Sequence, residues 1–104
     1  IKRNMQIKIL KDINTFKEKM LSEDSIIIDI RDPESFLDSN IPRSENFNSN
    51  DLIDFVNQND KTKELLIYCY KGNSSRKVAH FLSESGFKKV YSLIGGFDSW
   101  KNNK

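Results

Sequence analysis

Three short and almost uninterrupted apolar runs constrain the fold of this chain more than any other feature: residues 25–30, 64–69 and 89–94. Each has the length of a strand and is rich in β-branched or aromatic residues. The first two hardly alternate between apolar and polar residues, which is typical of parallel strands covered by helices on both faces. Residues 6–10 alternate in part and predict an edge strand, and a fainter signal at residues 46–48 predicts a fifth strand.

Helix signals lie between these runs. Thr15 and Glu18 have the spacing of a capping box, next to an apolar face made of Ile13, Phe16 and Met20. Asp32 before Pro33 predicts an N-cap followed by proline at the first helical position. The other predicted helices are one capped by Asn50, one capped by Ser74 or Ser75 that ends at Gly86, and a short one with Phe97 and Trp100.

This alternation of strands and helices predicts an α/β fold: a five-stranded, mainly parallel sheet with helices on both faces. With 104 residues, the chain fits one domain, which we expect to span residues 1–104.

Composition narrows the functional classes. Seventeen Lys and Arg against fifteen Asp and Glu give a net charge of +2, which predicts neither a nucleic-acid partner nor a membrane partner. One Cys and one His exclude an intramolecular disulfide and a Cys/His zinc site, so no metal is expected. The N-terminus lacks an apolar signal segment. We therefore expect a cytoplasmic domain.

The segment from Cys69 to Arg76 carries the strongest chemical signal. Cys69 ends an apolar strand, and a helix is predicted to begin shortly after it, so the cysteine lies where parallel sheets bind ligands. A loop that leads into a helix N-terminus directs backbone N–H groups toward an anion, and Gly72 allows the turn. A thiolate there would have a lowered pKa and act as a nucleophile. The alternative is a buried structural cysteine, and the geometry alone leaves both open.

Three blocks of the sequence resemble the signatures of one enzyme family. They are residues 29–36 (DIRDPESF), residues 69–75 (CYKGNSS) and residues 90–100 (VYSLIGGFDSW). In this order and at this spacing they resemble the rhodanese family of sulfurtransferases, in particular its single-domain thiosulfate sulfurtransferases of the GlpE type. The resemblance covers about residues 5–101 and implies a rhodanese-like fold.

The resemblance also implies a mechanism. Cys69 would take the outer sulfur of a donor such as thiosulfate, leaving sulfite and a cysteine persulfide. A second nucleophile, such as cyanide, a small or protein thiol, or thioredoxin, would then remove that sulfur. Such a double displacement is covalent catalysis and requires no cofactor.

The loop after the nucleophile would hold the persulfide and the anionic donor, with Tyr70, Lys71, Gly72, Asn73, Ser74 and Ser75. Their amides would form a cradle comparable to an oxyanion hole. The ammonium of Lys71 would hold thiosulfate, unless Lys71 is simply a solvated loop lysine. Ser74 and Ser75 would cap the helix or support the loop through their hydroxyls, and Tyr70 would line the entrance or pack on the surface.

Asp29 and Arg31 match the first family signature and are expected to support the site. Asp29 ends a central strand and would pair with Arg31 or Arg76, as a structural ion pair rather than as a direct catalyst. His80 is expected to be a surface or partly packed residue rather than a general base.

Two positions depart from the family pattern. Asn40 stands where many members have a histidine of mainly structural role, which predicts a local rearrangement. Ser74 stands where many family loops carry arginine, so Lys71 is left as the main cation of the loop.

Three other functions share parts of this pattern. A cysteine phosphatase would need a longer loop with an arginine to grip the phosphate; that position is Ser75 here, and Arg76 comes one residue late. A non-catalytic adaptor is disfavoured because Cys69 and Gly72 are present. A persulfide carrier for a partner protein needs the same loop, so the sequence does not separate it from a thiosulfate:cyanide transferase.

Overall fold

The computed structural model describes residues 8–103. Its elements in chain order are β1 (Leu10–Lys11), α2 (Ile13–Lys19), β2 (Ser25–Asp29), α3 (Pro33–Asp38), β3 (Ser44–Asn46), α4 (Ser49–Gln58), β4 (Glu64–Tyr68), α5 (Asn73–Glu84), β5 (Lys89–Leu93) and α6 (Gly96–Asn102). The five strands form one sheet in the order β1-β5-β4-β2-β3, and every neighbouring pair is parallel. The predicted α/β fold with a five-stranded parallel sheet is confirmed.

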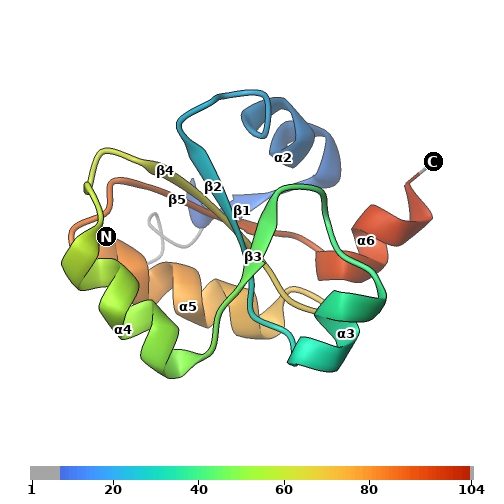
Figure 1. Cartoon of the computed structure of the whole chain (residues 1–104). Helices are drawn as coiled ribbons and strands as arrows, with labels where there is room; N and C mark the ends of the chain where they lie inside the picture. The colour runs from blue at the N-terminus through green and yellow to red at the C-terminus, as the bar shows by residue number, and fades with distance from the viewer. Residues whose placement is uncertain (1–7, 104) are drawn as a thin grey trace.

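Helices cover both faces of this sheet, as the continuous apolar runs predict (Figure 1). On one face, Ile28 and Ile67 pack with residues of α4 and α5, including Phe55 and Leu82. On the other face, the neighbouring strand residues pack against α2 and α6 in a second cluster of Phe16, Ile27, Ile41, Leu66, Tyr68, Leu93 and Phe97. Because successive residues of β2 and β4 enter opposite cores, neither strand alternates between apolar and polar side chains.

The predicted edge strand at residues 6–10 is wrong in its bounds. Leu10 is its only residue in β1, Lys8 and Ile9 are helical, and residues 6 and 7 lie outside the described part of the chain. β1 pairs with β5 through Leu10 opposite Ser92. The partial alternation instead places Ile9 in the core beneath α5.

Three helix starts differ from prediction, each by two or three residues. Asp12, not Thr15, caps α2, because its carboxylate accepts the amide of Thr15 at 2.8 Å. Asn48, not Asn50, caps α4, in a complete capping box with Asp51. Gly72, not a serine, is the N-cap of α5, in a left-handed conformation. The sequence pattern predicted that these helices exist, but the cap residue of each is set by single hydrogen bonds or by the turn of one glycine.

Other predicted helix ends are confirmed. Asp32 caps α3 and Pro33 is its first residue. Gly86 follows the end of α5 with a positive φ of 111°, and the amide of Phe87 donates to the carbonyl of Leu82, as in a Schellman motif.

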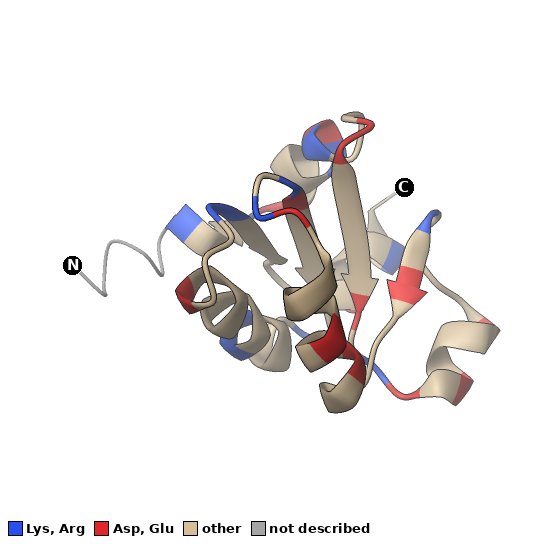
Figure 2. Ribbon diagram, turned by 60° about the vertical axis from the view of Figure 1, so that its left-hand side comes forward, with Lys and Arg blue, Asp and Glu red and all other residues tan. Residues whose placement is uncertain are grey.

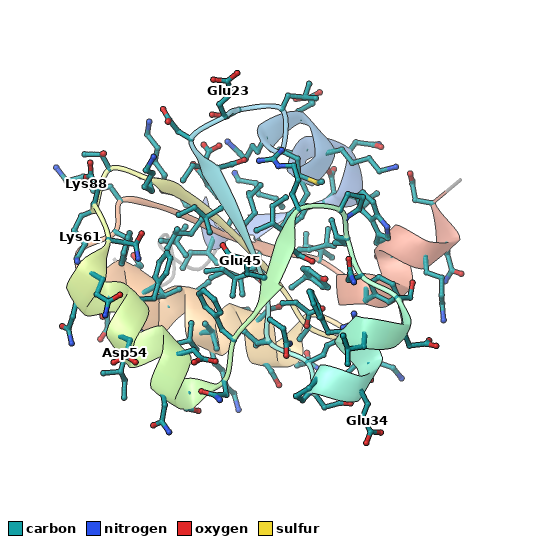
Figure 3. The ribbon with its side chains drawn as sticks, in the orientation of Figure 1. Glu23, Glu34, Glu45, Asp54, Lys61 and Lys88 are labelled. Carbon is teal, nitrogen blue, oxygen red and sulfur yellow. The ribbon has the colours of Figure 1, made fainter. Side chains whose placement is uncertain are left out.

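Charged side chains lie mainly at the periphery. Glu23, Glu34 and Lys88 project outward from the rim of the molecule (Figure 3). Basic and acidic residues are intermixed along the ribbon (Figure 2). None of the helices in residues 8–103 has the length and apolar character needed to cross a membrane.

Candidate active site around Cys69

Cys69 lies directly after β4, at the carboxyl edge of the sheet, and only 6% of its surface is exposed. The loop leads into α5, which begins at Asn73. The first turn of α6 holds this loop from the other side, since the amide of Phe97 donates to the carbonyl of Cys69 at 2.7 Å and that of Asp98 to the carbonyl of Tyr70 at 3.1 Å. The cysteine is therefore positioned by backbone contacts from three elements.

Three hydrogen bonds meet at the sulfur of Cys69. The amides of Gly72 and Ser75 donate to Sγ at 3.1 Å and 3.3 Å, and the thiol donates to the Ser75 hydroxyl at 3.3 Å. Burial raises the pKa of the Cys69 thiol, but the hydroxyl and amide of Ser75 and the amide of Gly72 outweigh it, so the pKa lies below its ordinary value. A lowered pKa makes the thiolate, the nucleophilic form, more abundant at neutral pH.

Part of the predicted cradle faces the sulfur. Gly72 and Ser75 direct their amides at Sγ, and the amide of Lys71 also helps to lower the pKa of the Cys69 thiol. The side chains of Asn73 and Ser74 are exposed. Gly72 has φ 98°, and a Cβ there would lie 3.0 Å from the amide nitrogen of Gly95. The turn that aims its amide at the sulfur thus requires glycine.

Lys71 and Tyr70 point to different neighbours. Lys71 is exposed and lines a cavity of about 520 Å³ together with Gly95 and Asp98, which lie at the N-terminus of α6. Tyr70 directs its hydroxyl to Asp32 and Ser35 at the start of α3. The hydrogen bond with Tyr70 has the largest effect on the Asp32 carboxyl, and together with the bonds from Ser35 it lowers the pKa of Asp32 to about 2.

Asp29 and Arg31 form the expected ion pair. The guanidinium of Arg31 donates to Asp29 at 2.8 Å and to the carbonyl of Ser39 at 2.5 Å, and both partners are buried. Burial lowers the pKa of Arg31, but its bond to Asp29 reverses the effect and raises it. Arg31 also stacks 4.1 Å from the ring of Phe97, which ties the end of β2 to α6.

The remaining candidates lie apart from the sulfur. Arg76 is exposed on α5, one residue beyond the buried Ser75. His80 pairs with Glu84 at 2.5 Å, one turn later in the same helix, in agreement with the expected partly packed residue. Asn40 donates to the carbonyl of Phe36 at 2.8 Å and so closes the end of α3.

Sequence reasoning missed one polar residue beside the site. Ser92 of β5 is fully buried, and its hydroxyl lies 2.8 Å from that of Ser75. Within an apolar strand run it reads only as an interruption, because its partner is seventeen residues away in the chain.

Comparisons with known proteins agree with this geometry. Residues 12–103 match the model of the rhodanese-like domain. The chain is 43% identical over 84 residues to the thiosulfate sulfurtransferase GlpE of Coxiella burnetii, which covers 81% of this chain and 78% of that protein. It is 36% identical to the GlpE of Pseudomonas syringae over 81% of this chain and 79% of that protein. A crystal structure of a rhodanese-like domain protein from Staphylococcus aureus superposes with a TM-score of 0.75 at 26% identity, covering 88% of this chain and 89% of that one.

Proposed function

The chain belongs to the rhodanese family of sulfurtransferases, and we propose that it moves the outer sulfur of thiosulfate to a thiophilic acceptor through a persulfide on Cys69. The observation that carries the proposal is the set of hydrogen-bonding groups around Sγ: two amides and one hydroxyl within 3.3 Å of a buried thiol. Relatives named thiosulfate sulfurtransferase support the choice of donor.

The first step forms the persulfide. The Cys69 thiolate attacks the outer sulfur of thiosulfate, a new S–S bond forms, and the S–S bond of thiosulfate breaks. Sulfite leaves with the electron pair of that bond. The negative charge then lies on the outer sulfur of the persulfide, where backbone N–H groups of the loop stabilise it as an oxyanion hole stabilises oxygen.

The second step regenerates the enzyme. A nucleophile such as cyanide attacks the outer sulfur, forms thiocyanate, and leaves the Cys69 thiolate with the electron pair of the broken S–S bond. The two steps together are a double displacement and need no resolving cysteine. A small thiol, a protein thiol or thioredoxin takes the place of cyanide by the same chemistry. The cytoplasmic location remains a prediction from the sequence.

The test is the intact mass of the reduced protein, before thiosulfate, after thiosulfate, and after subsequent cyanide. We expect a gain of one sulfur atom with thiosulfate and its loss as thiocyanate with cyanide. No gain from thiosulfate contradicts the proposed donor. Loading by another persulfide donor, such as mercaptopyruvate with its sulfurtransferase, would then favour the carrier function, and failure with every donor would favour an adaptor.

A second prediction concerns Lys71, which we propose holds the thiosulfate dianion. Lys71→Ala should raise the KM for thiosulfate about tenfold with a smaller change in kcat, because the ammonium binds the donor before sulfur transfer begins. Added salt should weaken the wild type and leave the variant little changed. Lys77→Ala removes the same charge from the exposed side of α5 and is the matched control. Equal KM values for the two variants would contradict this role.

A further inference from the structure

The inner end of the active site is a buried chain of two hydroxyls. Ser75 Oγ lies 3.3 Å from Cys69 Sγ, and Ser92 Oγ lies 2.8 Å from Ser75 Oγ. Ser75 is in the first turn of α5 and Ser92 is in β5, so the chain joins two elements through the core. Both serines are fully buried.

The position of Ser92 is unusual for a serine. Residues two apart in a strand share a face, so Ser92 lies on the same side of β5 as the core residue Val90, facing α5. An apolar side chain is the ordinary choice at a fully buried strand position. A buried hydroxyl there is tolerated when it is hydrogen-bonded, and Ser75 supplies the bond.

We infer that Ser92 is a positioning residue that orients the Ser75 hydroxyl toward the Cys69 sulfur and so stabilises the thiolate. The inference deepens the proposed function, on which its relevance to sulfur transfer rests. Ser92 itself does not touch the sulfur. It acts through Ser75.

The direction of the effect follows from counting protons. When Cys69 is a thiol, the three groups carry three protons and the chain has two hydrogen bonds, so one proton is left over. With the thiol donating to Ser75 and Ser75 donating to Ser92, that proton is the one on Ser92. When Cys69 is a thiolate, Ser92 donates to Ser75, Ser75 donates to sulfur, and both remaining protons are used. The thiolate form therefore gains more from Ser92 than the thiol form does.

The charged side chains around the site have other partners or are exposed. Asp29 and Arg31 pair with each other at the end of β2, and the side chains of Lys71 and Arg76 are exposed. Other titratable residues on the elements around the site include Tyr68 of β4, Tyr70 of the loop, Asp32 at the N-terminus of α3, Asp98 of α6, and Lys11 of β1. The bonds to Sγ come from Ser75 and Gly72.

The experiment measures the rate of Cys69 alkylation by iodoacetamide against pH, with no sulfur donor present. The rate follows the thiolate, so it rises with pH and its midpoint reports the pKa. We expect Ser92→Ala to move the midpoint upward and to lower the thiolate fraction near neutral pH about threefold. Ser75→Ala should lower it more, about tenfold, because it removes the direct bond.

The double variant separates a chain from two independent effects. If Ser92 acts through Ser75, Ser92→Ala should have almost no effect on the midpoint in a Ser75→Ala background. Ser25→Ala is the matched control: Ser25 is also buried, but it begins β2, whereas Cys69 follows the carboxyl end of the parallel strand β4. A shift with Ser92→Ala no larger than with Ser25→Ala would overturn the inference, and so would the same shift in both backgrounds.

A second pair of variants guards against misfolding. Ser92→Thr and Ser92→Val have the same shape and both suit a strand, but only threonine keeps the hydroxyl. We expect the threonine variant to keep the wild-type midpoint and the valine variant to shift it; equal midpoints would overturn the inference. Alkylation needs no sulfur donor. The midpoints can therefore be interpreted even if the protein does not accept sulfur from thiosulfate.

Discussion

Cys69→Ser is expected to abolish sulfur transfer from thiosulfate, with a loss of about 10⁴-fold or more in kcat/KM. A serine hydroxyl is almost wholly protonated at neutral pH, and the donors around position 69 are placed to stabilise a thiolate rather than to remove a proton. Oxygen also forms no stable counterpart of a persulfide. The variant should show no gain of sulfur in the intact mass after thiosulfate.

The same substitution should leave the fold nearly unchanged. Serine is close in size to cysteine, and the amides of Gly72 and Ser75 have an oxygen to donate to in place of Sγ. Thermal unfolding followed by circular dichroism should therefore give a similar Tm, and Ser25→Ala serves as the control for losing one buried polar contact. Residual activity above about one percent of wild type, with a normal Tm, would mean that another group is the nucleophile.

The parts of the fold that the sequence predicts well are those decided by burial over several residues. In β2, Ile27 packs on one face of the sheet and Ile28 on the other, so a continuous apolar run is the direct consequence of helices on both sides. Caps depend on one or two hydrogen bonds of single residues. Asn48 caps α4 because Asp51, three residues later, completes a capping box with it, whereas Asn50 is followed at that distance by Ile53.

The site divides in the same way. Cys69 follows from its place between a buried strand and a helix start, which is information local to the chain. The bond of Ser92 to Ser75 and those of Tyr70 to Asp32 and Ser35 join residues that are far apart in sequence. Nothing in the neighbourhood of Ser92 marks it as a partner of the cysteine loop. Such pairings depend on strand order, which places β5 beside β4.

Gly96, the first residue of α6, packs directly against the backbone of the cysteine loop. A Cβ on Gly96 would lie 2.5 Å from the carbonyl oxygen of Cys69 and 2.6 Å from the carbonyl carbon of Tyr70. These are backbone atoms, which have no rotamer to move away. Gly96 also has φ 58°, where a side chain is strained. Any other residue must therefore push the cysteine loop outward or shift the start of α6.

Gly96→Ala is expected to lower kcat/KM about 100-fold, because a displaced loop no longer aims its amides at the sulfur. It should also reduce the free energy of unfolding by about 2–3 kcal/mol, since the amides of Phe97 and Asp98 would lose their bonds to the loop carbonyls. Steady-state kinetics on the folded fraction and urea unfolding measure the two effects separately.

Gly86→Ala is the matched control for the cost of placing a side chain at a positive φ. Gly86 also has a positive φ, of 111°, but a Cβ there meets nothing closer than the Lys61 side chain at 3.8 Å. This variant should lose about 1 kcal/mol of stability. It should keep its activity per folded molecule, because Gly86 follows the C-terminus of α5, whereas the cysteine loop precedes its N-terminus. If Gly96→Ala lowered activity no more than Gly86→Ala, backbone strain alone would explain the loss. The close approach of α6 would then play no part in holding Cys69 in place.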